Sequence, residues 1–507
     1  MPHPLRLLLF LALSLPFASA QETHDHGVPE KLGKVSFPIS CAPTVQDDFN
    51  RGVALLHSFA YSAAKSEFQS VVTRDPQCAM AHWGVAMTYY QPLWQPPVSP
   101  ATSPIAEQEI GLATQIGART ERERGFIRAL SLIFESTDTV PYPERASQYE
   151  RAMSVVASQN KDDAEAQVFY ALALIANASP TDKTHTKQKQ AAELLEPLYR
   201  AYPQHPGIPH YLIHACDIAE MAQRGLAPAR AYSQIAPSAP HALHMPSHIF
   251  TRLGLWNDSI LSNLAAREAA DRLGDTGDEL HAMDYLVYAY LQAGQDQEAS
   301  RLVEQLKEMH NLDQSDFKVA YAFTAIPVRL DVERGRWSDA SAIVPPEKAP
   351  PQVVAVALWA RGLGLARTGR PDSARMEIEK LERIEEQLHA AGEDYWATQV
   401  DIQIGEVQAW SAQASNKPDE AVELLRKAAD EEDAIEKLPV TPGPIIPARE
   451  QLGYLLLERN QPVLALKEFQ SALSNTPGRR GATLGAAQAQ QLSGSKNGGL
   501  SRSAQFH

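Results

Sequence analysis

The pattern of apolar and polar positions predicts helices throughout this chain, and no segment alternates in the manner of a strand. The segment 49–76 reads FNRGVALLHSFAYSAAKSEFQSVVTRDP, two apolar blocks that end at a proline. A segment near the other end repeats the same spacing of small, aromatic and proline positions. The two sets, whose intervals are identical, are Gly52, Ala64, Phe68 and Pro76, then Gly453, Ala465, Phe469 and Pro477. Small residues let two helices pack closely, and the proline ends the second helix.

This spacing resembles the tetratricopeptide repeat (TPR) family, whose unit is a hairpin of two helices with a period of about 34 residues. A weaker form, glycine followed five positions later by alanine, recurs at Gly294, Gly335 and Gly369. The resemblance implies an all-α fold, a superhelical array (solenoid) of about eleven TPR-like helical hairpins over residues 45–477. It also implies that ligands contact the inward face of each hairpin's first helix.

Several stretches depart from the repeat. Three of them, 92–104, 271–278 and 438–447, are rich in proline or glycine and predict loops or a lengthened step. The charged run DEEDAIEK at 430–437 is typical of a solvated helix end. Residues 21–44 predict an N-terminal arm, and 478–507 predict a C-terminal helix followed by a disordered Gly/Ser-rich tail.

The first twenty residues have the features of a secretory signal peptide. Arg6 precedes an apolar run over residues 7–17, and small residues lead to a cleavage site after Ala20. No later stretch is apolar enough to span a membrane. We therefore expect a bacterial-type exported protein, periplasmic or secreted.

Three cysteines fit an oxidising compartment without requiring one. We expect a disulfide between Cys41 and Cys78, which flank the first repeat, although the sequence alone leaves the pairing open. Cys216 is interpreted as a buried core thiol. A net charge of -15 without a basic block disfavours nucleic acid and anionic membranes as partners. Common catalytic motifs are absent from the sequence.

Histidine is concentrated between residues 205 and 290. Two segments, HPGIPHYLIHACD and HALHMPSHIF, hold most of these histidines, and His281 follows. The interval from His210 to His244 equals that from His214 to His248, and both match the repeat period of about 34 residues. Two helix positions therefore hold histidine in consecutive repeats. Aligned on the repeat, six imidazoles share the inward face: His210, His214, His241, His244, His248 and His281.

Several imidazoles on neighbouring helices predict a transition-metal site. Nitrogen ligands without a thiolate favour a copper or zinc ion. Asp217 and Asp284 on the same face are candidates for ligand, imidazole orienter or general base, and Tyr288 is a candidate inward hydroxyl or redox-active ring. Pro246 disfavours a helical conformation at Met245. If the helix begins only there, His241 and His244 lose the face that they share with His248, although a loop can still supply ligands.

The sequence supports more than one function. The leading hypothesis is a copper or zinc centre in the concave groove that binds or transforms a small-molecule or peptide ligand. If the chain is an enzyme, it is a copper-dependent oxidoreductase or a zinc-dependent hydrolase. One alternative is a metal-free TPR scaffold for a protein or peptide partner, and another is metal storage or delivery. The sequence does not identify the substrate, the partner or the oligomeric state.

Overall fold

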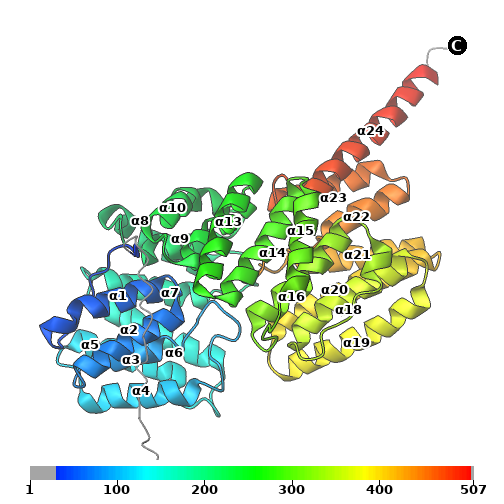
Figure 1. Cartoon of the computed structure of the whole chain (residues 1–507). Coiled ribbons are helices and arrows are strands. Elements are labelled where there is room, and N and C mark those ends of the chain that lie inside the picture. The colour runs from blue at the N-terminus through cyan, green and yellow to red at the C-terminus, as the bar shows by residue number, and fades with distance from the viewer. Residues whose placement is uncertain (1–29, 504–507) are drawn as a thin grey trace, which may run out of the picture.

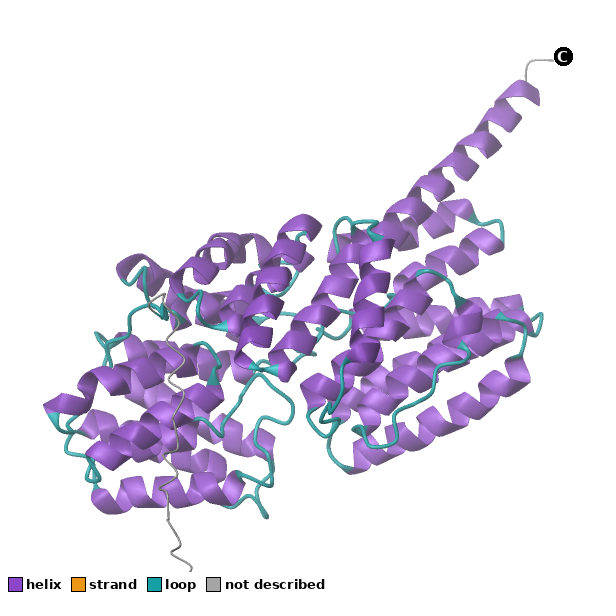
Figure 2. Cartoon of the chain, viewed as in Figure 1, coloured by secondary structure: helices purple, strands orange, loops and turns teal. Residues whose placement is uncertain are grey.

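The computed structural model describes residues 30–503, and within that range the regular elements are helices without a strand (Figure 2). The first half contains η1 (Pro43–Val45), α1 (Gln46–His57), α2 (Tyr61–Arg74), α3 (Ala79–Met87), α4 (Ser103–Ile116), α5 (Glu121–Phe134), α6 (Tyr142–Gln159), α7 (Ala164–Ala176), α8 (Thr186–Ala201), α9 (Gly207–Cys216), α10 (Ala222–Ile235), α11 (Pro240–His244), α12 (Pro246–Arg252) and α13 (Trp256–Leu273). The second half contains α14 (Thr276–Gln292), α15 (Asp296–Glu308), α16 (Phe317–Glu333), α17 (Trp337–Ala340), α18 (Pro351–Arg367), α19 (Pro371–Ala390), α20 (Asp394–Ala414), α21 (Pro418–Asp433), α22 (Ala448–Glu458), α23 (Pro462–Asn475) and α24 (Arg480–Ser503).

Consecutive helices pack as hairpins, from α1 with α2 to α22 with α23. If α11 and α12 count as one interrupted helix, the described chain holds eleven hairpins between residues 46 and 475. Figure 1 shows the array curving from the blue and cyan hairpins, through the green helices α8 to α13, to the yellow and orange hairpins. The prediction of an all-α, TPR-like solenoid is confirmed.

The glycines of the repeat allow the backbone of one helix to contact an aromatic ring of the neighbouring helix. Phe68 of α2 is fully buried and lies between Gly52 of α1 and Gly84 of α3. A Cβ built at Gly52 would lie 2.6 Å from the Phe68 ring, and one at Gly84 would lie 2.5 Å from it. Gly453 meets Phe469 in the same way, at 2.6 Å, in the last hairpin. Glycine at these positions is therefore required by helix packing.

The described part of the N-terminal arm, residues 30–44, is ordered by contact with the array. Phe37 is fully buried, and its ring centroid lies 5.4 Å from that of Phe49 and 5.5 Å from that of Trp83. The structure pairs Cys41 with Cys78, with 5.0 Å between their Cα atoms, while Cys216 is free and buried. The signal peptide expected at 1–20 lies outside the described residues.

The three departures from the repeat differ in kind. Residues 88–102 and 434–447 are long connections, between α3 and α4 and between α21 and α22. The stretch at 271–278 is instead mostly helical. Helix α13 is 18 residues long and is followed by a turn at Gly274, with φ of +67°, that leads into α14.

The described part of the C-terminal end is a single helix. Helix α24 continues from Arg480 to Ser503, through the stretch expected to be a disordered tail, and projects from the array in Figure 1. Its first half is rich in alanine, glutamine and leucine, which favour helix. Residues 504–507 lie outside the described range.

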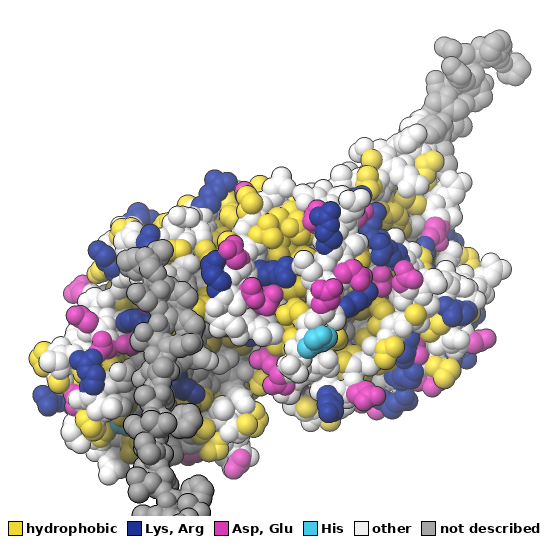
Figure 3. Space-filling view, in the orientation of Figure 1, with side chains coloured by type: hydrophobic (Ala, Val, Ile, Leu, Met, Phe, Trp, Pro, Cys, Tyr) yellow, Lys and Arg dark blue, Asp and Glu magenta, His cyan; other side chains and the backbone are white. Residues whose placement is uncertain are grey.

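The face of the molecule in Figure 3 carries interspersed acidic and basic side chains and little histidine. No helix among residues 30–503 combines the length and the apolar character that a membrane span needs.

Candidate metal centre

Four helices bring the six candidate imidazoles together. Helix α9 supplies His210 and His214, α11 supplies His241 and His244, α12 supplies His248 and α14 supplies His281. All six side chains are buried; His214 is the most accessible, at 8%. Burial explains why the predicted histidine-rich face is not visible as a surface patch.

The rings form one continuous cluster. Their centroids are 4.9 Å apart for His210 and His214, 5.0 Å for His210 and His241, and 5.9 Å for His241 and His244. The cluster continues with 5.0 Å from His244 to His248 and 4.4 Å from His244 to His281. The side chains offer two groups of three nitrogen ligands, and within each group the ligand atoms lie within 4.8 Å of one another: His210, His214 and His241, then His244, His248 and His281.

Pro246 interrupts the helix but does not separate its histidines. Met245 keeps helical dihedral angles, with φ of −52° and ψ of −36°, although the residue before a proline usually avoids them. Its amide donates to His241 O at 2.9 Å, and its side chain is fully buried. The helix therefore does not begin only at Met245, and the histidines keep their shared face because packing holds α11 and α12 in line.

The tautomer of His244 is determined by its neighbour. Asn263 Nδ2 donates a hydrogen bond to Ser259 O at 2.8 Å. Asn263 Oδ1 therefore faces His244 Nδ1, at 2.6 Å, and accepts a hydrogen bond from its N–H group. His248 Nδ1 donates to Asp217 Oδ2 at 3.0 Å. Both Nε2 atoms then carry a lone pair, and they face each other at 3.1 Å.

The first group contains a pair of Nε2 atoms at the same distance, although only one of its two rings has a partner at Nδ1. His210 Nδ1 donates to the backbone oxygen of His57 at 2.6 Å, which leaves a lone pair on His210 Nε2. This atom lies 3.1 Å from His214 Nε2. His214 Nδ1 and both ring nitrogens of His241 are buried without a hydrogen-bond partner. Buried polar atoms are rarely left unpaired, so this group also fits an ion.

Burial keeps these imidazoles neutral, which is the form that binds a metal. Loss of hydration lowers the pKa of His210 to about 3, and it also lowers the pKa values of the other members of the cluster. Mutual repulsion between protonated rings adds to the lowering; for His241 the contributors are His210, His244, His214 and His281.

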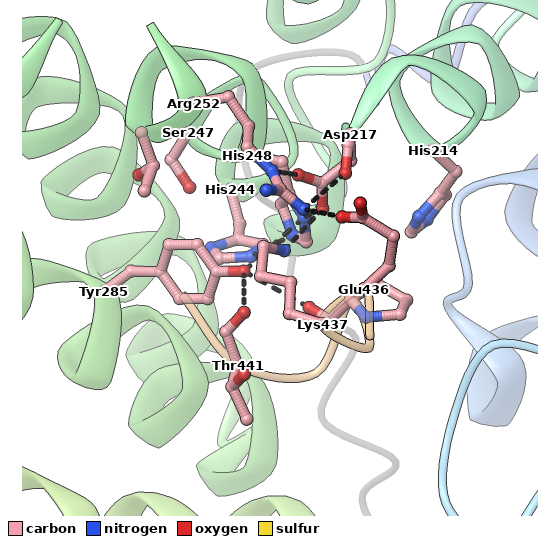
Figure 4. A network of polar contacts seen from close by, with 12 residues as sticks. His214, Asp217, His244, Ser247, His248, Arg252, Tyr285, Glu436, Lys437 and Thr441 are labelled. Carbon is pink, nitrogen blue, oxygen red and sulfur yellow. Dashed lines mark hydrogen bonds and ion pairs between the residues drawn. The ribbon is translucent and has the colours of Figure 1, made fainter. Parts of the chain in front are cut away.

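Asp217 is the carboxylate that touches the cluster. Besides His248, it binds Lys437 Nζ at 2.6 Å and Arg252 Nε at 2.9 Å (Figure 4). Burial alone would raise the pKa of Asp217, but Lys437, Arg252 and His248 hold it well below its usual value. Asp217 is therefore an ionised group that orients His248 and is neutralised by two cations.

The other two predicted participants face elsewhere. Asp284 forms a two-point ion pair with Arg329, at 3.0 and 3.2 Å, and Tyr288 accepts a hydrogen bond from Arg479 at 3.3 Å. Tyr285 contacts the second group of histidines, and its ring centroid lies 4.7 Å from that of His244. Its hydroxyl is within hydrogen-bond distance of the backbone oxygens of Pro439 and Thr441, at 3.2 and 3.1 Å (Figure 4).

Two of the connections that break the repeat cover the histidines. A small cavity of about 10 Å³ is lined by His214, His241, His248 and His281 from the cluster. Its remaining walls are Phe59, Leu93, Trp94, Pro439 and Val440. Leu93 and Trp94 come from the connection between α3 and α4, and Pro439 and Val440 from the one between α21 and α22. Sequence reasoning identified both as breaks in the array but not as walls of the site.

Three polar residues of the site were missed. Asn263 and Arg252 have no sequence signal, because each is one of several polar residues in its helix. Lys437 belongs to the charged run at 430–437, for which the expectation of a solvated end is wrong at this position: its side chain is 10% exposed and lies in an ion pair with Asp217. Its carboxylate partner, 220 residues away, explains the burial.

A third group of possible ligands is already satisfied by hydrogen bonds. Glu165 accepts from His57 Nε2 and His205 Nε2, both at 2.9 Å. His57 Nδ1 lies 2.9 Å from Tyr211 Oη, and His205 Nδ1 accepts from the amide of Ile208 at 3.3 Å. With every ring nitrogen paired, this group is a structural network beneath α9.

No protein family model and no curated protein matches the chain. Among solved structures, the chain is similar to the P58(IPK) TPR domain, with 13% identity and a TM-score of 0.22, over 91% of this chain and all of that one. It is also similar to the human IFIT1 dimer with m7Gppp-AAAA, with 10% identity and a TM-score of 0.36, over 82% of this chain and 90% of that one. Nothing about the ligand of this chain follows from such distant likenesses.

Proposed function

We propose that this chain is an exported TPR-like protein whose central repeats hold a transition-metal centre, of copper or zinc, that binds or transforms a small ligand. The observation that carries the proposal is the pair of Nε2 atoms of His244 and His248, which face each other at 3.1 Å while both Nδ1 atoms donate elsewhere. Two opposed lone pairs in a buried site repel each other, and a cation between them removes the repulsion.

The distances fit a metal ion. Imidazole nitrogens bind zinc at about 2.0–2.1 Å, so two of them 3.1 Å apart subtend an angle of about 100° at the ion, close to tetrahedral. Asn263 and Asp217 act as the groups that orient the ligating rings, a role that carbonyl and carboxylate oxygens commonly fill around metals.

The surroundings favour oxidative over hydrolytic chemistry. Hydrolytic zinc sites commonly place a general base near the open position. Among the described residues that line the small cavity, the non-histidine members are aromatic or aliphatic. Asp217 is held by Lys437 and Arg252, and Asp284 by Arg329. A copper centre needs no such base, and we therefore place copper ahead of zinc.

Export is supported by one observation besides the sequence of residues 1–20. The Cys41–Cys78 disulfide needs an oxidising compartment to persist.

The test is elemental analysis of the tag-free protein purified from its export compartment. We expect near-stoichiometric copper or zinc in the natural sequence and its loss in His214→Ala/His248→Ala. The matched control is His310→Ala/His389→Ala, which removes two exposed histidines and should keep the metal. Circular dichroism establishes that each variant is folded, and His248→Gln provides a milder change. Absence of metal from the natural protein, even after reconstitution with each ion, would refute the proposal.

A second candidate function is peptide binding by the C-terminal repeats. Their inner side holds a cavity of about 170 Å³ whose walls include Trp359, Tyr395, Trp396 and Arg449. Aromatic and charged side chains of this kind suit an extended peptide. If this is the main function, partner binding is lost in Trp396→Ala and unaffected by metal removal. Storage or delivery of metal, a third possibility, requires an ion that exchanges readily and supports no turnover.

A further inference from the structure

The six histidines consist of one three-membered unit that occurs twice. Each unit contains a pair separated by one helical turn, His210 with His214 or His244 with His248, and the two pairs are one repeat period apart. The third member comes from the next repeat, three residues before the position that aligns with the first histidine of the pair. This member is His241 for the first unit, ahead of His244, and His281 for the second, ahead of Asp284.

Each unit alone has the spacing that one ion needs. The Nε2 atoms of its pair are 3.1 Å apart in both units, and its three ligand atoms lie within 4.8 Å of one another. A single ion shared by all six rings could not lie between the two Nε2 atoms of both pairs at once. At least one pair of opposed nitrogens would then be left without an ion between them. In the next repeat the pair positions are Asp284 and Tyr288, which bind Arg329 and Arg479, so the series of units ends after two.

The two units adjoin and open onto the same space. The ring centroids of His214 and His248 are 5.8 Å apart, and those of His241 and His244 are 5.9 Å apart. The small cavity takes two walls from the first unit, His214 and His241, and two from the second, His248 and His281. At about 10 Å³ it has room for roughly one water-sized ligand.

From this arrangement we infer that the centre is dinuclear: each unit of three histidines binds one copper ion, and a single small ligand, dioxygen, bridges the two ions in the shared cavity. The inference rests on the proposed metal centre and specifies its nuclearity and ligand. In the oxygen step each Cu(I) gives up one electron, and dioxygen takes both to become a bridging peroxide. No atom leaves, and the oxygen–oxygen bond order falls from two to one.

Charge explains why copper in the reduced state suits this pair of sites. The ligands are six neutral imidazoles, and two divalent ions would place four positive charges in a buried site. Lys437 and Arg252 stand nearby, with Asp217 and Glu436 as their partners, so no spare anion offsets that charge. Two Cu(I) ions halve the charge, and a peroxide supplies two negative charges when the ions become divalent.

The apolar walls fit the same ligand. Phe59, Trp94 and Val440 give the cavity no hydrogen-bond donor other than the indole nitrogen and the histidines themselves. A charged or strongly hydrogen-bonding ligand would lose its hydration there, whereas dioxygen is apolar and loses little.

The test is anaerobic loading of the tag-free, full-length, metal-free protein with Cu(I), followed by measurement of copper per chain and of oxygen uptake. Two coppers per chain are expected, with one dioxygen consumed per two coppers and a product whose two Cu(II) spins are coupled and silent in electron paramagnetic resonance. His241→Asn and His281→Asn alter one unit each, and both ring nitrogens of His241 are buried without a hydrogen-bond partner. Each variant should bind one copper tightly and show an uncoupled Cu(II) signal after oxidation. The control His310→Ala/His389→Ala should behave as the natural protein.

The outcomes separate the two proposals. One copper per chain in the natural protein would overturn the dinuclear inference and leave the metal centre standing. Two coppers with two uncoupled signals, or with no oxygen uptake, would overturn the bridging dioxygen. Binding of no copper would overturn both. If the asparagine variants do not fold, the copper count and spin coupling of the natural protein still decide the question.

Discussion

At the scale of single residues, the centre depends on which nitrogen of each imidazole carries its proton. His210, His244 and His248 all use Nδ1 to bind a protein oxygen, so their Nε2 atoms are free for a metal. These oxygens come from the backbone carbonyl of His57, the side-chain amide of Asn263 and the carboxylate of Asp217. The residues that prepare the site are therefore as important as the histidines.

Asn263 provides a direct test of this preparation. Replacing Asn263 with Leu removes the acceptor of His244 Nδ1 and should weaken metal binding by about 10- to 100-fold. Asn263→Asp keeps an oxygen acceptor at the same place and should retain most of the affinity. Competition with a chelator of known affinity measures both. Equal affinities for the two variants would show that this hydrogen bond does not orient the ring.

The buried imidazoles also predict how the stability of the metal-free protein depends on pH. The pKa of His210 is lowered to about 3 from 6.5 by burial, so the folded state binds fewer protons than the unfolded state below pH 6.5. Stability is complete above that pH and falls as the pH drops from 6.5 toward 3, by up to about 1.4 kcal/mol per pH unit for each such ring. Carboxyl groups whose pKa values burial raises act in the opposite direction; among them are Glu432, raised to about 8, and Asp331, raised to about 6. The contribution of the cluster is therefore measured as a difference between the natural protein and a variant with one imidazole fewer.

Denaturant unfolding of the metal-free protein between pH 7.5 and pH 5 measures this dependence. We expect the free energy of unfolding to fall toward pH 5, and to fall less steeply in His241→Asn, which has one imidazole fewer. An equal slope in the natural protein and in His241→Asn would contradict the neutral, buried state of the cluster.

At the scale of the helices, the interrupted pair α11 and α12 keeps its histidines on one face although proline separates the two segments. Local preference at Met245 is overruled by its complete burial and by its hydrogen bond to His241. Close helix contacts through glycine have the same origin, since they are selected by packing and not by helix propensity.

Gly84 tests the cost of those contacts. Gly84→Ala places a methyl group 2.5 Å from the buried ring of Phe68 and should destabilise the protein by about 1–3 kcal/mol. Gly111→Ala, in α4, meets no atom within 4 Å and should instead stabilise by up to about 1 kcal/mol. Thermal unfolding of both variants measures the difference. A stabilising effect of Gly84→Ala would show that α2 and α3 are not closely packed.

At the scale of the whole molecule, the site joins segments that are far apart in the sequence. The connection between α21 and α22 reaches back to the central repeats, where Lys437 binds Asp217, and Glu436 N donates to Pro180 O at 2.7 Å. Together with Trp94 from the connection between α3 and α4, it encloses the histidines. The curvature of the array brings these two connections over the same helices.

Lys437 should control how fast the metal escapes. Lys437→Met keeps the length of the side chain but removes its ion pair with Asp217, which retains Arg252 and His248 as partners. We expect the protein to stay folded and to lose metal to a chelator about tenfold faster or more, because truncating one member of a buried pair mainly affects release. The control is Lys427→Met, whose side chain is 66% exposed and should have no effect. Equal rates of metal release from Lys437→Met and from the natural protein would show that the ion pair of Lys437 does not keep the α21–α22 connection over the histidines.

The sequence by itself determined the helical array, its approximate number of hairpins and the two histidine pairs. Each of these depends on a periodicity that the backbone of a helix imposes locally, either within one turn or over the length of one hairpin. The tertiary structure decided which residues contact these histidine pairs. It separated Asp217, which contacts His248, from Asp284, which binds Arg329, although both share the face that the repeat predicts. It also brought Asn263, Trp94 and Lys437 to the site, because contacts between distant repeats depend on the superhelical curvature and the course of two long connections, and no local pattern encodes either.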